Sequence, residues 1–241
     1  MWYFNYGDNM NLDKIKINKI IKGIIVFALF WYSIFFQYIP IYLFKLDTKN
    51  ISLSTQCLLS LFSGFVVAIL FIVIYWKDLK RDFITFKRNF FKYMDESFKY
   101  WILGLFVMCF SNILIRLLFH TNGANNENAL QELIKALPWA MFISAAITGP
   151  FNEEIVFRKT LIDIFKNKWV VTFLSFLLFG GAHVILNATV WTDYLYIIPY
   201  GALGAAFAYA DCKCENIIPS IFMHITHNTV LLLISIFSLT H

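Results

Sequence analysis

Charged residues are scarce in this sequence. Only 15% of its 241 residues are Asp, Glu, Lys or Arg, whereas 59% are hydrophobic and 19% are aromatic. Soluble domains normally carry about 25% charged residues. The shortage of charge excludes an ordinary soluble domain and favours a protein that crosses a membrane several times.

Two other features are missing. The apolar run that follows the lysine-rich N-terminus has no small-residue cleavage site, so we expect a retained helix and not a removed signal peptide. The sequence has no internal repeat or low-complexity tract, and its hydrophilic segments are too short to hold a soluble domain. Any chemistry is therefore expected at or inside the bilayer.

Cysteine is also rare, and its positions give little support for a metal centre. Cys57 and Cys109 lie in apolar stretches, where a thiol behaves as a small buried hydrophobe. Cys212 and Cys214 are separated by a single residue and have no second pair. A structural zinc site usually needs a wider spacing and two such pairs.

Long apolar stretches dominate the rest of the chain. A hydrocarbon core of about 30 Å needs about 20 apolar residues in a helix. The candidate spans are residues 23–44, 52–76, 100–119, 133–149, 169–187, 194–210 and 217–237. We therefore expect an all-α fold, a polytopic membrane helix bundle with about seven transmembrane helices, and six to eight as the bounds.

The distribution of basic residues predicts the orientation in the cell membrane. The segment 77–99 is rich in lysine and arginine, so the positive-inside rule places it in the cytoplasm, together with the basic N-terminus. Its interleaved aromatic residues also suit an interfacial amphipathic segment. The connection 120–132 has no Lys or Arg, as expected outside. Because the basic residues cluster between spans, they indicate topology and not a nucleic-acid partner.

The fourth span has an unusual continuation. We expect residues 133–149 to end at a break at Gly149–Pro150, after which the helical pattern continues to a basic tip at residues 166–168. The turn "DCKCEN" is expected in the cytoplasm, and the C-terminus outside.

Several polar residues lie where a bilayer should surround them. A charged residue at that depth costs roughly 3 kcal/mol on insertion scales, so each is a functional hypothesis by default. The clearest cases are Glu153, Glu154, His183, His224 and Asn228.

The spacing of these residues predicts how they are arranged. Glu154 and Arg158 are four residues apart, which favours a helical ion pair and leaves Glu153 free to point elsewhere. His224 and Asn228 are also four apart, so they share one face of their helix.

The levels of these groups agree under one condition. Glu153 lies roughly 20 Å from the basic tip at 1.5 Å per residue, and His183 a similar distance along the returning helix. His224 lies only about 12 Å into its own helix. Glu153, His183 and His224 can meet in the cytoplasmic half of the bilayer only if the basic tip protrudes by about two helical turns into the cytoplasm.

Carboxylates, imidazoles and an amide suit two kinds of hydrolytic site. A glutamate can activate water while donors hold the developing oxyanion. Alternatively Glu153, His183 and His224 could hold a divalent metal such as zinc, with water in the open position. No Gly-Xaa-Ser-Xaa-Gly pattern offers a covalent nucleophile. Any single histidine, His227 included, can equally serve as a hydrogen-bonding group between helices.

Three motifs occur in order on successive expected helices. "EEIVFR" fits Glu-Glu-x-x-x-Arg, "FGGAH" fits Phe-x-x-x-His, and "HITHN" fits His-x-x-x-Asn. Together they resemble the CPBP (CAAX protease and bacteriocin-processing, Abi) family of intramembrane proteases, which includes the CAAX prenyl endopeptidases of the Ras-converting type. The resemblance covers roughly residues 135–235. It implies a catalytic four-helix core at 133–241, preceded by three helices and a basic cytoplasmic loop at 1–132.

The resemblance also implies roles. Glu153 would activate water with His183, and His224 and Asn228 would form the oxyanion side. Glu154 and Arg158 would support the site. Both metal-dependent and glutamate-dependent labels are used for such enzymes, and we favour direct water activation without a cofactor. Lys159 departs from the small residue that relatives often carry there, which would either alter the packing or place a charge at the cavity mouth.

The expected function is an intramembrane endopeptidase that cleaves a membrane-associated peptide or protein at the cytoplasmic side. The richness in Ile, Asn, Lys and Phe suggests a bacterial genome, where peptide or bacteriocin maturation or self-immunity fits better than prenyl processing. The alternative is a non-catalytic membrane partner or immunity protein that regulates a sensor or receptor. An ion carrier would show paired broken helices in two related halves, whereas one break is expected here.

Overall fold

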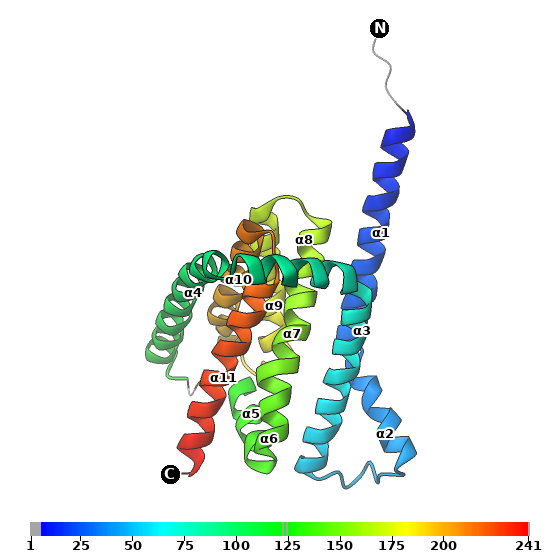
Figure 1. Cartoon of the computed structure of the whole chain (residues 1–241). Coiled ribbons are helices and arrows are strands. Elements are labelled where there is room, and N and C mark those ends of the chain that lie inside the picture. The colour runs from blue at the N-terminus through cyan, green and yellow to red at the C-terminus, as the bar shows by residue number, and fades with distance from the viewer. Residues whose placement is uncertain (1–5, 122, 124, 241) are drawn as a thin grey trace.

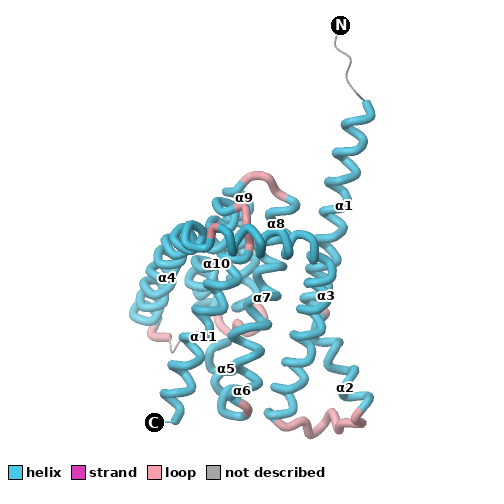
Figure 2. Tube along the Cα trace, in the orientation of Figure 1, coloured by secondary structure: helices cyan, strands magenta, loops and turns pink. Residues whose placement is uncertain are grey.

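The computed structural model describes residues 6–121, 123 and 125–240, and these residues form helices and no strand. Figure 1 shows most of the helices standing side by side in one bundle, with the N-terminal helix projecting beyond it. The tube in Figure 2 shows only short connections between them. The predicted all-α helix bundle is confirmed.

The first expected span is bent. Helix α1 (Tyr6–Trp31) is followed by the 3₁₀ turn η1 (Ser33–Gln37) and by α2 (Tyr38–Leu43), and the two parts meet at 54°. The hydroxyl of Ser63 donates a 2.6 Å hydrogen bond to the carbonyl of Ser33 at the bend. That bond ties α3 to the bend.

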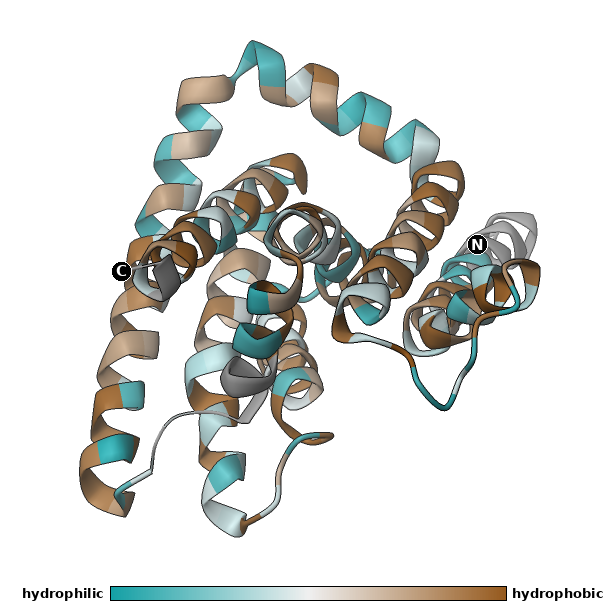
Figure 3. Ribbon diagram, turned by 90° about the horizontal axis from the view of Figure 1, so that it is seen from below, coloured by the Kyte–Doolittle hydropathy of each residue, from teal (hydrophilic) through white to brown (hydrophobic). Residues whose placement is uncertain are grey.

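The basic segment 77–99 is helical. Helix α3 (Leu53–Arg88) and helix α4 (Phe90–Phe119) are separated only at Asn89. In Figure 1 the C-terminal part of α3 crosses the top of the bundle, and in Figure 3 this crossing part alternates between hydrophilic and hydrophobic residues. The arrangement fits the expected amphipathic segment and corrects the expectation of a loop.

The expected break at Gly149–Pro150 is wrong. Helix α5 (Asn125–Ala136) replaces most of the expected external loop, and the chain breaks just before Pro138, where a residue preceding proline avoids helical geometry. From there α6 (Pro138–Met141), α7 (Gly149–Glu154) and α8 (Thr160–Ile164) form one continuous helix. They are joined by the π-helical segments η2 (Phe142–Thr148) and η3 (Ile155–Lys159).

The last helices pack closely through glycine. Helix α9 (Lys168–Val184) is followed by the 3₁₀ turn η4 (Trp191–Tyr196), α10 (Ile197–Cys214) and α11 (Ile218–Thr240). A Cβ at Gly180 would lie 2.6 Å from the carbonyl oxygen of Ile197, so only glycine allows this approach of α9 and α10. The expected turn "DCKCEN" is mostly helical, because α10 continues to Cys214.

Length and hydropathy support a membrane protein. Helices α3, α4 and α11 are long and apolar enough to span a bilayer, and the bent pair of α1 with η1 and α2 would make a fourth among the described residues. The run 138–164 is about 40 Å long at 1.5 Å per residue. The total of seven spans stays a prediction.

The basic segments gather at one end of the bundle. In Figure 1 the crossing part of α3, the α8–α9 connection and the start of α1 lie at the top, whereas the α2–α3 connection and the C-terminus lie at the bottom. Apart from α1, the α8–α9 connection is the highest part of the bundle in this view. The membrane face to which this end belongs stays a prediction.

Candidate active site

The candidate site begins on α7, where Glu153 and Glu154 precede a π-helical turn. At the end of that turn, the amide of Thr160 donates to the carbonyl of Ile155, one residue further back than in an α-helix. The Thr160 hydroxyl donates to the same carbonyl at 3.0 Å. Such π turns occur frequently at functional sites, because they change the direction of the side chains around them.

Glu154 lies at the centre of a buried charged cluster. It is fully buried, and its Oε1 accepts a 2.7 Å hydrogen bond from Nδ1 of His224 on α11. Its Oε2 lies 3.3 Å from Nε of Arg158, which is also fully buried. The predicted ion pair between Glu154 and Arg158 is therefore present. The same carboxylate of Glu154 also fixes the orientation of the His224 ring.

The Arg158 guanidinium lies between aromatic rings. Its central carbon is 4.2 Å from the centre of the Phe179 ring and 5.7 Å from the centre of the Phe207 ring. A desolvated cation over an aromatic face gains on the order of 2 kcal/mol. This contact and the carboxylate of Glu154 both oppose the cost of burying the charge, although the guanidinium nitrogens have no hydrogen-bond partner among the described residues.

Glu153 is the accessible member of the pair. Its side chain is 20% exposed, and its Oε2 lies 3.7 Å from Nε2 of His224. His224 thus stands between two carboxylates, with Nδ1 held by Glu154 and Nε2 facing Glu153. The prediction that Glu153 points away from the ion pair is confirmed.

His183 joins the site through Phe179. Its Nδ1 donates to the carbonyl of Phe179 at 2.9 Å, so its Nε2 carries the free lone pair when the ring is neutral. Its ring lies 4.4 Å from the Phe179 ring and stacks on Tyr200 at 4.8 Å. The Phe179 ring also lies 5.7 Å from His224. Within the described part of the chain, no hydrogen bond or ion pair joins His183 directly to Glu153.

Asn228 is anchored by the π-helical segment before Pro150. In that segment the amide of Gly149 donates to the carbonyl of Ser144, five residues earlier. By the same pattern, the carbonyl of Ala145 would accept a hydrogen bond from the amide of the residue after Gly149. That residue is Pro150, which has no N–H. The side-chain amide of Asn228 donates to the Ala145 carbonyl instead, at 2.9 Å. A second N–H of the same amide remains for another acceptor.

Two buried residues behind the site were not predicted. Asp211 near the end of α10 is 1% exposed, and its Oδ2 accepts a 2.8 Å hydrogen bond from the hydroxyl of Ser220. Asp211 lies close enough to Glu154 and Arg158 for their charges to interact. The sequence placed Asp211 in a cytoplasmic turn, and the one available signal was an acid directly after the apolar run of α10.

Other candidate residues have different surroundings. His227 packs its ring 6.2 Å from Trp101 of α4. Lys159 pairs with Asp163 at 2.6 Å and with Asp78 of α3 at 3.6 Å, and it is only 7% exposed. The expected charge at a cavity mouth is therefore neutralised in a buried ion cluster between helices.

The side chains present have the chemistry of a zinc site, but their placement does not form one. Two imidazoles and a glutamate are common zinc ligands, and a histidine whose other nitrogen donates to a carboxylate is typical around such metals. Among the described residues, however, no group of three His, Cys, Asp or Glu side chains lies close enough together to hold a metal ion.

Comparison with known proteins finds the same region similar to a protein family. A family model described as "Type II CAAX prenyl endopeptidase Rce1-like" matches residues 135–230, the segment that carries all three motifs. The resemblance drawn from the motifs is thereby confirmed for this segment. At the level of class, the match supports a membrane peptidase.

One of the curated relatives carries a name of this class. The chain is similar to "Putative membrane peptidase YdiL" of Bacillus subtilis, with 28% identity over 140 residues that cover 56% of this chain and 55% of that protein. It is also similar to "UPF0177 protein YbdI" of Lactococcus lactis, with 26% identity over 182 residues that cover 70% of this chain and 92% of that protein. The chain thus matches little more than half the length of YdiL. No solved structure matches it significantly.

Proposed function

We propose that this protein is an intramembrane endopeptidase that hydrolyses a peptide bond with a water molecule activated by Glu153 and His183. The observation that carries the proposal is the position of His224 between the buried Glu154 and the accessible Glu153. A buried acid that orients an imidazole, next to a partly exposed acid, suits hydrolysis by a water molecule that the exposed acid activates.

The proposed reaction uses Glu153 and His224, which face each other, and Asn228, one turn further along α11. Glu153 takes a proton from water as the oxygen attacks the carbonyl carbon of the substrate, and the carbonyl oxygen becomes negative. His224, with its Nε2 protonated, and the free N–H of Asn228 donate to that oxygen. When the carbon–nitrogen bond breaks, the proton on Glu153 passes to the leaving amine, so no net charge remains.

His183 has a narrower part in this scheme. Because its Nδ1 is bonded to the Phe179 carbonyl, its Nε2 can accept a hydrogen bond from the attacking water and orient it toward the substrate. The stacking on Tyr200 holds the ring in that orientation.

A metal-dependent form of the same reaction is the alternative. Glu153, His183 and His224 would have to move closer together to hold the ion, because they form no metal-holding group among the described residues. A bound ion would supply an acidified water. Both forms place the same residues around the scissile bond, so only the response to a chelator and to added metal separates them.

The substrates that we propose are membrane-associated peptides, in peptide or bacteriocin maturation or in self-immunity. The basic end of the bundle in Figure 1 would face the cytoplasm under the positive-inside rule. Acidic or lipid-held segments would be attracted to that end.

The test is cleavage of a peptide library in reconstituted liposomes by the wild type, Glu153→Gln and His183→Ala, with and without chelator. Loss of cleavage in both variants, with the wild type insensitive to chelator, supports direct activation of water. Loss under chelator that added zinc restores favours the metal-dependent form. If all three proteins behave alike, the protease proposal fails and a non-catalytic membrane partner becomes the leading explanation.

A further inference from the structure

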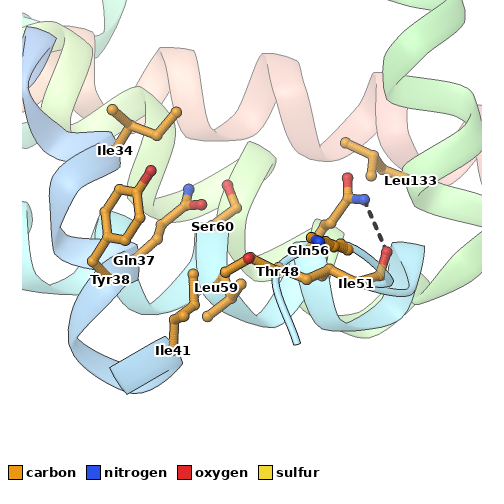
Figure 4. Close-up of a pocket in the computed structure, with 11 residues that line it drawn as sticks. Ile34, Gln37, Tyr38, Ile41, Thr48, Ile51, Gln56, Leu59, Ser60 and Leu133 are labelled. Atoms are coloured by element: carbon orange, nitrogen blue, oxygen red, sulfur yellow. Dashed lines mark hydrogen bonds between the residues drawn. The ribbon is translucent and has the colours of Figure 1, made fainter. Parts of the chain in front are cut away.

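A cavity lies away from the candidate active site, between the segment η1–α2 and the start of α3. Its volume is about 520 Å³, and none of its lining residues belongs to the charged cluster around Glu154. In Figure 1 these elements converge at the bottom of the bundle, the end opposite to the basic segments. Figure 4 shows side chains from α2, the α2–α3 connection and α3 around it.

One part of the lining is polar and lacks partners. Gln37, Thr48, Lys49 and Ser60 line the cavity, and within the described chain their side chains have no hydrogen bond or ion pair. By contrast, the neighbouring Gln56 donates to the carbonyl of Ile51 at 3.3 Å. Gln37 and Ser60 are half-buried, whereas Thr48 and Lys49 are exposed. A few polar groups that converge on one cavity are typical of a binding site, so these unpaired side chains point to a ligand with hydrogen-bond acceptors.

The charge of the cavity is positive. Lys49 is its only charged lining residue. The nearest acid along the chain, Asp47, accepts hydrogen bonds from the amide of Lys49 at 2.9 Å and from the side chain of Asn50 at 2.9 Å. Among the described residues the ammonium of Lys49 forms no ion pair with Asp47 or with another acid, so it is available to an anion from outside the chain.

The polar groups are arranged by depth. Thr48 and Lys49 lie on the connection at the end of the bundle, whereas Ser60 lies two turns further along α3, which is about 10 Å deeper. Ile34 and Leu59 add an apolar wall at the deeper level. A phospholipid has the same order, with a phosphate at the surface, ester carbonyls below it and acyl chains deepest.

We propose that this cavity holds one anionic phospholipid molecule, with its phosphate at Lys49 and Thr48 and its ester carbonyls at Gln37 and Ser60. A lipid is favoured over a peptide because the cavity borders a surface of exposed apolar residues, such as Ile39 and Tyr42, that faces the bilayer in a membrane-spanning chain. The proposal concerns lipid binding and does not depend on peptidase activity.

The test is native mass spectrometry of the full chain in a detergent free of phospholipid, with phosphatidylglycerol or phosphatidylcholine of identical acyl chains added. We expect the wild type to retain one phosphatidylglycerol in preference to phosphatidylcholine. Lys49→Gln should lower that affinity about tenfold, the usual effect of losing one charge-assisted contact. Lys45→Gln is the matched control, because Lys45 lies on the same connection but does not line the cavity.

A second variant protects the test against a general effect of charge. Ser60→Leu keeps the charge and fills the cavity, so it should also lose the bound phosphatidylglycerol while its melting temperature stays near that of the wild type. Equal retention of the two lipids, or unchanged binding by either variant, would overturn the proposal. Displacement of the lipid by an equimolar apolar peptide with a free C-terminal carboxylate would assign the cavity to peptides instead.

Discussion

The ring of His224 is held by Glu154 at 2.7 Å through Nδ1, while its other nitrogen faces Glu153 at 3.7 Å. Adjacent acids in the sequence therefore have opposite environments, one fully buried and paired with Arg158, the other partly exposed. This difference in environment separates a residue that supports the site from one that can react.

Changing Glu153 or Glu154 to glutamine should have different effects on the cleavage rate and on stability. Glu153→Gln should lower the cleavage rate by about 10²–10⁴-fold, the usual contribution of a general base, and should leave the melting temperature near that of the wild type. Glu154→Gln should destabilise the protein by about 3 kcal/mol, because the buried Arg158 then lacks its counter-charge. Cleavage assays and thermal unfolding in the same detergent measure both effects. Equal melting temperatures for the two variants would contradict this assignment.

The contact between Asn228 and the Ala145 carbonyl should be coupled to Pro150. Asn228→Ala should cost about 1–3 kcal/mol, because it leaves a partly buried carbonyl unpaired. In a Pro150→Ala background the new amide at position 150 can bond to that carbonyl, so the same change should cost less. A double-mutant cycle on the free energy of unfolding measures the difference. Strict additivity would show that Pro150 is not the reason for the contact.

Ser220 should act as a positioning residue for the charged cluster. Ser220→Ala removes the 2.8 Å hydrogen bond to Asp211 and should lower kcat about tenfold with little change in KM, because Glu154 and His224 lose their fixed orientation. Ser111→Ala is the control, since the Ser111 hydroxyl bonds only to carbonyls of its own helix α4. If both variants lower kcat equally, the effect is one of general packing.

The α9–α10 contact should reject an added methyl group at one glycine and accept it at another. At Gly201 a Cβ would lie 2.8 Å from the backbone oxygen of Phe176, so Gly201→Ala should cost about 1–3 kcal/mol. At Gly181 the nearest atom is the flexible Cδ1 of Ile185 at 3.1 Å, so Gly181→Ala should be close to neutral. Thermal unfolding of the two variants gives the comparison. A neutral Gly201→Ala would mean that the helices can move apart at low cost.

Local sequence patterns correctly predicted part of the fold and part of the candidate site. Apolar runs and their length predicted the helix bundle, and the four-residue spacing predicted the ion pair of Glu154 with Arg158. The three ordered motifs predicted the family match over residues 135–230. These features depend on residues that are neighbours along a helix or on motifs that can be read without long-range contacts.

Other predictions failed where distant helices decide the outcome. Gly149–Pro150 was expected to break the helix, yet the chain stays helical there because a π-helical segment precedes it. Pro150 has no amide to donate to the carbonyl of Ala145, and the side chain of Asn228 on α11 donates to that carbonyl instead. Lys159 was expected at a cavity mouth, yet Asp78 of α3 and its own neighbour Asp163 neutralise it.

The sequence by itself determined that this protein is a membrane helix bundle with a candidate hydrolytic set of acids, imidazoles and an amide, because hydropathy and helical spacing act over short stretches of chain. Only the tertiary structure decided which glutamate is buried, that Asp211 and Ser220 stand behind it, and that a polar cavity forms at the other end. Burial and pairing depend on which helices meet, and α7, α10 and α11 meet through side chains far apart in the sequence.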